Sequence, residues 1–421
     1  MQPESFLVMA EMRKKIDQNL LIALTLFVVL ASCSPAPEVG GGIGGTGRLT
    51  SVASGPITGF GSVFVSGTEY ETTDASMLID GQPGSQGDLK EGMLVRVTAT
   101  VTKRSGTNDP LLRMADTLVY EDTLEGFVQF VTPTGSHLVA LGQSVTITPT
   151  TLIDASIPGG TVRNLVPGRD LVEISGFVMG DGVIRATWIG LKTLDATTAT
   201  PNYQVKGLIT NHKADQRTFE VGTLTVEYRD AVVQQLPDPS HGWDGVMVDI
   251  VGKQVSPEPQ NRLRLTATRV RLEELGASDS EDAVVEGFVT RVLSSGKFLL
   301  GNLQVVTNTE TALQGGTSTD IFVGRHLEVH GRLVGGIMTA TKMELEDADL
   351  HGVVTQVLAP DHFVLENVHV LTNAETILEG GTSDDIVVGV HLEVYGLVVD
   401  GTVTATKLEF ERVTTLPGTS P

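Results

Sequence analysis

Residues 287–346 read GFVTRVLSSGKFLLGNLQVVTNTETALQGGTSTDIFVGRHLEVHGRLVGGIMTATKMELE, and residues 352–411 read GVVTQVLAPDHFVLENVHVLTNAETILEGGTSDDIVVGVHLEVYGLVVDGTVTATKLEFE. The two stretches align without a gap at an offset of 65 residues, and about 35 of the 60 aligned positions are identical. Self-similarity at a fixed period is typical of a protein built from structural repeats. We therefore interpret the rest of the chain as further copies of this unit.

Three landmarks of the unit recur upstream in a weaker form. Each copy has an opening glycine before an apolar strand, a second glycine before an alternating strand, and an alanine in a closing strand. Because they recur five times in one order, we predict five domains of about 65–80 residues. The opening glycines are Gly55, Gly126, Gly207, Gly287 and Gly352; the second glycines are Gly92, Gly168, Gly245, Gly324 and Gly389; the alanines are Ala115, Ala186, Ala267, Ala340 and Ala405.

Within a repeat, apolar residues recur with a period of two. Leu327 and Val329 alternate with Glu328 and His330, which is the pattern of a half-buried strand. Three strand candidates, a less periodic spacer such as residues 309–324, and two more strand candidates follow in that order, which is the order of the OB-fold. We predict an all-β protein of five tandem, small OB-like β-barrel repeats, with small β-sandwich repeats as the alternative.

The predicted segments follow from these landmarks. They are a signal peptide at 1–32, a lipidated glycine-rich tether at 33–54, β repeats at 55–122, 123–195, 203–275, 284–347 and 350–412, and a disordered tail at 413–421. The clearest linkers are residues 195–202 and 276–282.

The N-terminus has the pattern of an export signal. Basic residues 13–15 precede the apolar run 20–31, which is too short to span the ~30 Å of a bilayer core and fits the middle of a signal peptide. The run ends in Leu30-Ala31-Ser32-Cys33, which resembles the lipobox of bacterial lipoproteins.

Cys33 is the only cysteine, so it cannot form a disulfide within the chain. In a lipobox the small residues admit a peptidase and the thiol takes a diacylglyceryl group. We expect the mature chain to begin at Cys33 and its acyl chains to hold it on a membrane. Ser34, rather than Asp, follows the cysteine, which favours the outer membrane of the bacterial envelope. The alternative is an uncleaved anchor with a buried cysteine.

The segment after Cys33 adds a resemblance. Residues 42–47 match G-x-G-x-x-G, but no strand precedes them and no helix follows, so a tether is the better interpretation than a dinucleotide site. The leader GGGIGGTG at 40–47, followed by GPITGFGSVFVSGTEYET at 55–72, resembles bacterial envelope lipoproteins built from repeated OB-like domains of unknown function. The resemblance implies a lipid-anchored protein of several β domains and carries no catalytic residue.

Composition narrows the class of partner. Lys and Arg number 29 and Asp and Glu 51, for a net charge of −22, which argues against nucleic acid because phosphates require a basic face. Apolar residues at 40% and charged residues at 19% fit a folded protein.

One loop has a composition suited to binding. Residues 237–244 read PDPSHGWD and bring together Asp238, His241, Trp243 and Asp244. An exposed tryptophan beside these polar groups could stack on a sugar ring and bind its hydroxyls, as loops of OB-folds can. The alternative is that Trp243 packs as a plug against its own barrel.

Other candidates for chemistry are weaker. His326 and His330 would lie about 13 Å apart on a strand, too far to share a zinc ion. The acidic run of Asp279, Glu281 and Asp282 lacks the spacing of a calcium loop and fits a solvated linker. We find no G-x-S-x-G nucleophile motif, and we expect no cofactor and no metal.

We therefore expect a non-enzymatic, lipid-anchored cell-envelope protein that acts as a multi-domain binding or spacer module. Its partners would be the membrane, through the lipid on Cys33, and an envelope protein or glycan. A cell-wall or polysaccharide-binding lipoprotein is the alternative, and an envelope hydrolase is a third interpretation.

Overall fold

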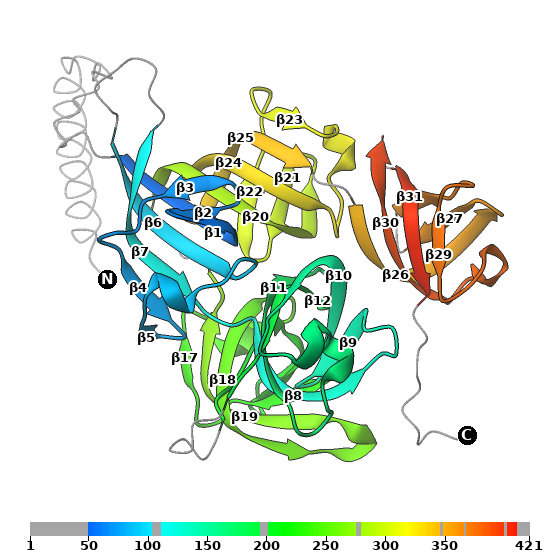
Figure 1. Ribbon diagram of the computed structural model, residues 1–421, viewed down its shortest axis with the longest axis horizontal. Coiled ribbons are helices and arrows are strands. Elements are labelled where there is room, and N and C mark those ends of the chain that lie inside the picture. Colours follow the sequence, from blue (N-terminus) through cyan, green and yellow to red (C-terminus); the bar gives the residue numbers. More distant parts are fainter. Residues whose placement is uncertain are drawn as a thin grey trace, which may run out of the picture. The chain divides into compact units, whose positions relative to one another are not determined.

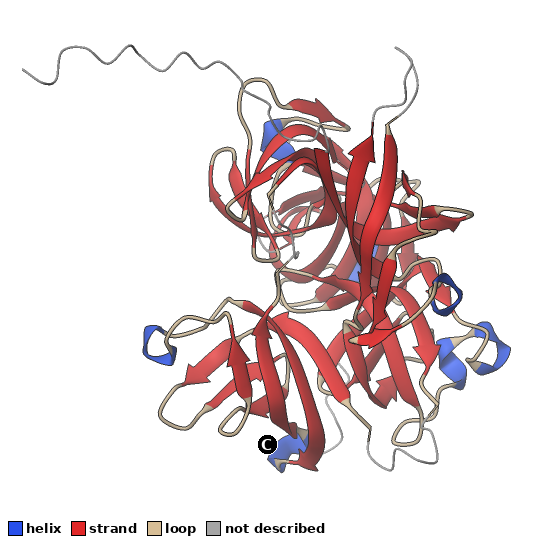
Figure 2. Ribbon diagram, turned by 90° about the vertical axis from the view of Figure 1, so that its left-hand side faces the viewer, coloured by secondary structure: helices blue, strands red, loops and turns tan. Residues whose placement is uncertain are grey.

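A computed structural model of the protein describes residues 49–102, 111–193, 201–274, 279–345, 348–365, 368–399 and 402–410. Strands make up most of this part of the chain, and its helices are short 3-10 turns (Figure 2). None of the helices in these ranges has the length and apolar character needed to cross a membrane. The predicted signal peptide, the lipobox with Cys33, and the C-terminal tail lie outside the described residues.

Repeat 4 shows how each barrel is built. Strand β20 pairs antiparallel with β21 and β24, β21 pairs with β22, β22 pairs in parallel with β25, and β25 returns to β24. The pairings close a ring in the strand order of the OB-fold, which confirms the predicted small barrel over the sandwich. The strands are β20 (Ser280–Ser294), β21 (Lys297–Leu300), β22 (Leu303–Val306), β24 (His326–Val334) and β25 (Ile337–Leu345), with β23 (Ala312–Gln314) and the 3-10 helix η6 (Ser318–Asp320) in the spacer.

The other repeats close in the same order (Figure 1). Repeat 1 has β1 (Leu49–Phe60), β2 (Val63–Val65), β3 (Thr68–Tyr70), β4 (Ser76–Ile79), β5 (Gln82–Pro83), η1 (Gln86–Asp88), β6 (Leu94–Thr102) and β7 (Leu112–Tyr120). Repeat 2 has β8 (Leu124–Val131), β9 (His137–Ala140), β10 (Gln143–Ile153), η2 (Pro158–Gly160), η3 (Val162–Asn164), β11 (Leu171–Val178) and β12 (Ile184–Leu191).

In repeat 3 the first strand is divided into β13 and β14. Repeat 3 has β13 (Tyr203–Leu208), β14 (Thr210–Lys213), β15 (Thr218–Val221), β16 (Leu224–Glu227), β17 (Val232–Gln234), η4 (Pro239–His241), β18 (Met247–Pro257), η5 (Pro259–Asn261) and β19 (Leu263–Leu272). Repeat 5 has β26 (Ala348–Ala359), β27 (His362–Leu365), β28 (Val368–Leu371), β29 (Ile377–Glu379), η7 (Ser383–Asp385), β30 (His391–Val399) and β31 (Thr402–Phe410).

The second landmark glycine closes each barrel. All five have a positive φ, between 74° and 94°, in the turn that leads into the fourth strand. Each N–H donates to a carbonyl in the first strand segment of the same repeat, at 2.7–2.9 Å. Glycine adopts this left-handed backbone without steric cost, which explains why the landmark recurs. The donor–acceptor pairs are Gly92–Ile57, Gly168–Val128, Gly245–Ile209, Gly324–Val289 and Gly389–Val354.

The landmark alanines lie in the cores, with 1–5% of their surface exposed. Each faces a β-bulge in the fourth strand, where the paired residue is Ala99 in repeat 1 and a glycine in the others. At Gly331, for example, a Cβ would lie 2.2 Å from the carbonyl oxygen of Thr339. In repeats 2 to 5 the two backbones approach too closely for a Cβ at this bulge, and this further glycine was not among our landmarks.

The hydrophobic cores are partly shared between repeats. The buried residues of repeats 2 and 3 form one cluster, whereas repeats 4 and 5 each have their own. Trp188, on β12 of repeat 2, is only 5% exposed but packs with the core of repeat 1. The cores therefore join neighbouring barrels as well as filling them.

Strands also pair between repeats. Strand β1 runs parallel to β20 over Ser51–Ser54, which joins repeat 1 to repeat 4, and β8 pairs antiparallel with β13, which joins repeats 2 and 3. Repeats 1 and 4 are not neighbours in sequence, so the contacts differ from those of beads along a string. The residues from Leu49 to Ser54, which we placed in the tether, belong to β1 because β6 and β20 flank them on both sides.

We expected the acidic run before repeat 4 to be a solvated linker. Asp279 and Glu281 are exposed to solvent, but the run is bound to neighbouring residues and enters a strand. Asp282 forms an ion pair with Arg113 of repeat 1 at 2.9 Å, and Glu281 pairs with Arg332. Asp279 accepts a hydrogen bond from the backbone N–H of Gly335. Strand β20 thus begins at Ser280, inside the stretch that we interpreted as a linker.

Candidate functional site

The predicted loop at residues 237–244 lies between β17 and β18 and contains η4. Asp238 is exposed and accepts hydrogen bonds from the backbone N–H and the hydroxyl of Ser240, at 2.9 and 2.6 Å. His241 and Asp244 are also exposed. Trp243 is fully buried, and its Nε1–H donates to the carbonyl of Pro237 at 3.0 Å. The structure therefore supports the plug interpretation of Trp243, and a binding role for the three polar residues stays a prediction.

An aromatic cluster at the end of barrel 3 holds Trp243. Its ring stacks on His212, with centroids 4.4 Å apart and planes 11° apart, and lies 5.0 Å from the ring of Tyr228. His212 bonds to the Tyr228 hydroxyl through Nε2 at 2.8 Å, and its backbone N–H donates to Asp244 at 2.9 Å. Burial lowers the pKa of His212. These contacts give Trp243 a structural role.

A polar groove of about 430 Å³ lies on the same repeat. It is lined by β15 and β16, by the β14–β15 hairpin, and by the turn between β18 and β19. In OB-folds the face of the second and third strands and these two connections bind oligosaccharides and oligonucleotides. The charged residues of the lining are Lys213, Arg229, Arg262, Arg264, Glu220, Glu227 and Glu258.

Ion pairs fix the guanidinium groups of the groove. Arg262 approaches Glu220 at 2.6 Å, and Arg264 approaches Glu258 at 2.6 Å and Glu227 at 3.5 Å. The hydroxyl of Thr225 donates to Glu258 at 2.7 Å. Desolvation acts to raise the pKa of Glu258, but the bonds from Thr225 and Arg264 outweigh it, so the pKa falls below its usual value. Glu258 therefore stays ionised and orients Arg264.

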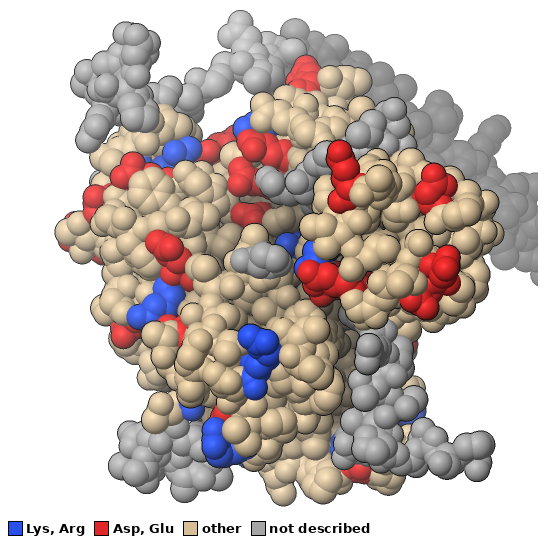
Figure 3. Space-filling model, turned by 45° about the vertical axis from the view of Figure 1, so that its right-hand side comes forward, with Lys and Arg blue, Asp and Glu red and all other residues tan. Residues whose placement is uncertain are grey.

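Basic side chains are exposed at the rim of the groove. Arg262 Nε is buried and makes no hydrogen bond within the described part of the chain. Lys213 and Arg229 are exposed at its rim. Four basic and three acidic side chains give the lining a balance of +1, whereas the whole chain carries −22. Acidic side chains predominate over the upper half of the face drawn in Figure 3. An anionic ligand would thus meet a more favourable potential in the groove than over much of the surface.

Repeats 4 and 5 lack the charged residues of this groove. The strand register places Glu220, Glu227 and Arg264 at the positions of Leu299, Val306 and Ile337 in repeat 4. The same register places Val364, Leu371 and Thr402 there in repeat 5. Because two barrels fold with apolar or neutral residues at these positions, the charges are not required by the fold.

The sequence holds a signal for this groove that we did not use. Four arginines lie within ten residues at alternate positions of two short runs. Arg262 and Arg264 line the groove, whereas Arg269 and Arg271 pair with Asp249. A strand that presents arginines at a period of two has a basic face. We singled out the neighbouring tryptophan loop instead, because its composition was more distinctive.

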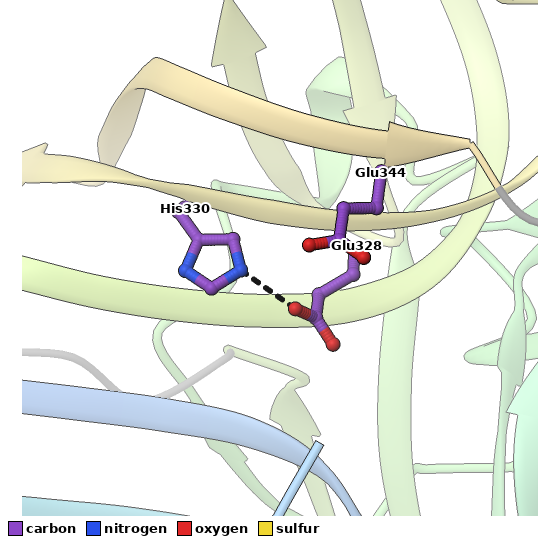
Figure 4. Close-up of side chains that lie close together, drawn as sticks. All are labelled: Glu328, His330 and Glu344. Carbon is purple, nitrogen blue, oxygen red and sulfur yellow. Dashed lines mark hydrogen bonds and ion pairs between the residues drawn. The ribbon is translucent and has the colours of Figure 1, made fainter. Parts of the chain in front are cut away.

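The two histidines of β24 lie in separate surroundings. His326 stacks on Phe288, with centroids 4.5 Å apart, and approaches Glu286 at 3.1 Å. His330 Nε2 bonds to Glu328 at 2.6 Å, and Glu344 lies close enough that the three side chains could hold a metal ion (Figure 4).

Repeat 5 gives this cluster a structural explanation. Tyr395 stands in place of His330, and its hydroxyl donates to Glu393 at 2.6 Å. In both repeats a lysine ammonium, of Lys342 or Lys407, pairs with the third carboxylate. Because a tyrosine serves equally well, the histidine acts as a hydrogen-bonding partner in the sheet, and we assign no metal to it.

A second group of carboxylates joins repeats 1 and 3. Glu121 lies between Arg96 at 2.9 Å and Arg271 at 2.7 Å, and Asp249 pairs with Arg271 at 2.9 Å. Desolvation acts to raise the pKa of Glu121, but Lys206, Arg96 and Arg271 lower it to about 2. A cavity of about 120 Å³ adjoins this network. The basic groups already neutralise the carboxylates, so the network links the repeats rather than offering a cation site.

The fold and these sites define a protein of repeated small β-barrels. Residues 125–190, 286–344 and 351–409 match the family described as "Domain of unknown function (DUF5666)", so this domain is present in repeats 2, 4 and 5. Comparison with curated proteins and with solved structures gives no match. The family shows the repetition that we predicted.

Proposed function

We propose that this protein is a non-enzymatic, lipid-anchored protein of the bacterial cell envelope that acts as a multi-domain binding module, and that repeat 3 carries its ligand site. The groove between β15, β16 and the β18–β19 turn is the observation that carries the proposal. Its charges are absent from the matching positions of repeats 4 and 5, and its volume falls within the usual 300–1,000 Å³ of ligand pockets.

The anchor in this proposal is the lipid on Cys33. The lipobox-like sequence Leu30-Ala31-Ser32-Cys33 and the single cysteine of the chain support it. Ser34 favours the outer membrane as the site of anchoring. Several acyl chains hold a protein stably on a bilayer, so the groove would act at the membrane rather than in free solution.

Contacts with repeats 1 and 2 hold repeat 3, and with it the groove, in place. Pairing of β8 with β13 and the ion pair of Glu121 with Arg271 tie repeat 3 to repeats 2 and 1. A site on an element that is fixed on several sides loses less conformational freedom on binding. Of the partners considered, an envelope glycan fits a polar groove on this face better than a protein surface does, and the groove therefore favours the polysaccharide-binding alternative.

A crosslinked pulldown from intact cells tests this function. The full-length lipidated protein is compared with a groove variant, Lys213→Gln with Arg262→Gln, and with a control in repeat 4, Lys297→Gln with Arg332→Gln. We expect one class of partner with the wild type and the control, and its loss with the groove variant. Equal recovery with the groove variant would refute a ligand site on repeat 3, and no specific partner for any form would favour a spacer.

A further inference from the structure

The side chains of the groove define a class of ligand. We propose that the groove of repeat 3 binds a polysaccharide that carries carboxylate groups, of the kind found in chains of uronic acids. The inference rests on the proposed function, since it names the ligand of the same site. It follows from the arrangement of arginines, carboxylates and hydroxyls, and from the absence of an exposed aromatic ring among the lining residues.

The arginines suit a carboxylate. A guanidinium group offers two parallel N–H donors that match the two oxygens of a carboxylate. Glu220 and Glu258 hold Arg262 and Arg264 in place at 2.6 Å each. Arg262 Nε is buried, but the side chain as a whole is 32% exposed, and Lys213 and Arg229 are exposed at the rim, so a ligand can reach basic side chains of the groove. A pre-oriented arginine gives up little freedom when a ligand binds.

The carboxylates of the groove suit hydroxyl groups. Glu220, Glu227 and Glu258 accept hydrogen bonds and repel a ligand that brings negative charge without hydrogen-bond donors. A sugar ring supplies several O–H donors for each carboxylate it carries, so it satisfies the glutamates and the arginines together. A polyphosphate supplies negative charge without donors, and an acidic peptide supplies one backbone N–H for each carboxylate, fewer than a sugar ring.

The lack of an aromatic stacking surface and the charge of the groove distinguish a carboxylated glycan from single-stranded nucleic acids and neutral sugars. Single-stranded nucleic acids bind through bases stacked on aromatic side chains, and neutral sugars lack the charge that would engage the arginines. Phe219 is the aromatic residue in the lining of this groove, and it is 1% exposed. The groove therefore offers charge and hydrogen bonds but no stacking surface, which favours a carboxylated glycan over either.

Calorimetric titration of the full-length chain tests the ligand class. The probes are an oligogalacturonate, the neutral maltohexaose, a thymidine oligonucleotide and a poly-glutamate peptide, at equal ionic strength. We expect saturable binding of the oligogalacturonate and none of the other three. Binding of another probe in preference would overturn the assignment of a carboxylated glycan.

Two variants tie the binding to the groove. Arg262→Lys keeps the charge and loses the planar fork, and we expect at least a tenfold weaker affinity; Lys213→Gln, on the exposed rim, should weaken it less. Arg332→Lys is the matched control in repeat 4 and should leave affinity unchanged. An unaltered affinity in both groove variants would overturn the inference, and the Lys213 variant still decides if Arg262→Lys fails to fold.

The two proposals fail in different ways. If the pulldown recovers a partner that depends on the groove, but the oligogalacturonate does not bind, the ligand class is wrong and the binding function stands. If neither the pulldown nor the titration depends on the groove residues, the proposed function fails with it.

Discussion

A buried group of carboxylates between repeats 1 and 2 predicts an unusual dependence of stability on pH. Asp122 is fully buried, accepts a hydrogen bond from the Tyr120 hydroxyl at 2.6 Å, and has a second oxygen without a partner among the described residues. Lys192 lies 3.4 Å from Glu125, 3.5 Å from Asp80, and in contact with Glu173. Four carboxylates thus face one ammonium group.

The protonation of Glu125 sets the size of the effect. Desolvation, opposed by Lys192 and reinforced by Glu173 and Asp80, raises its pKa from 4.5 to about 7. The folded protein therefore binds a proton that the unfolded chain releases near pH 4.5. The protonated Glu125 contributes about 3 kcal/mol to the free energy of unfolding below pH 4.5, and this contribution is lost as the pH rises through 7.

The substitution Glu125→Gln isolates this term. The amide is neutral at every pH, so the variant should lose the decline between pH 4.5 and 7 and be more stable than the wild type at pH 8. Denaturation in urea is followed by the fluorescence of the two tryptophans, of which Trp188 packs at the junction of repeats 1 and 2. The matched control is Glu91→Gln, at an exposed position of repeat 1.

The dependence of the free energy of unfolding on pH is compared for the wild type and the two variants. The wild type and the Glu91 variant should run parallel, and the Glu125 variant should be flatter. Parallel profiles for all three proteins would show that Glu125 does not hold a proton at neutral pH, and the account of this junction would then be wrong.

Four further outcomes follow from the fold and the anchor. Gly389→Ala should cost about 1–2 kcal/mol in a thermal melt because its φ is +94°, whereas Gly287→Ala, with open space and ordinary backbone, should cost little; equal losses would contradict the role given to the second landmark. Trp243→Ala should lower the free energy of unfolding, measured by urea denaturation, by about 3–5 kcal/mol, and Trp243→Phe should lower it by less. An unchanged free energy of unfolding would favour a binding loop over a plug. Glu121→Gln should remove about 3 kcal/mol of acid sensitivity below pH 4.5, since the folded pKa is about 2; an unchanged acid limb would count against the ion-pair network. Cys33→Ser should release the protein from membranes, and normal palmitate labelling of that variant would contradict the anchor.

The repeat count and the barrel follow from sequence because they depend on local rules. A positive φ at Gly324 and its four counterparts requires glycine wherever the chain turns into the fourth strand, so the residue recurs even when the rest has diverged. Alanines such as Ala340 recur at the buried position that pairs with the bulged residue of the fourth strand. Alternation of apolar residues then indicates the strands.

The contacts between repeats could not be predicted in the same way. The pairing of β1 with β20 joins residues more than 200 positions apart, and nothing in Ser51–Ser54 distinguishes a tether from a strand. Trp188 has the pattern of a core residue in its own strand, but it fills the core of the neighbouring barrel. Such contacts depend on the shapes of two folded surfaces, which a periodic pattern does not record.

The groove was not predicted from the sequence because its charged residues occupy outward positions of the strands. Alternation constrains the inward positions of a strand and leaves the outward ones free. Repeats 4 and 5 share most of their residues but differ at these free positions. Leu299 and Ile337 of repeat 4 correspond to Val364 and Thr402 of repeat 5. Repeat 3 has Glu220 and Arg264 there instead. In a protein of repeated domains, the outward positions where one copy departs from the others are therefore the place to search for a binding site, and Glu220, Glu227 and Arg264 are such a departure.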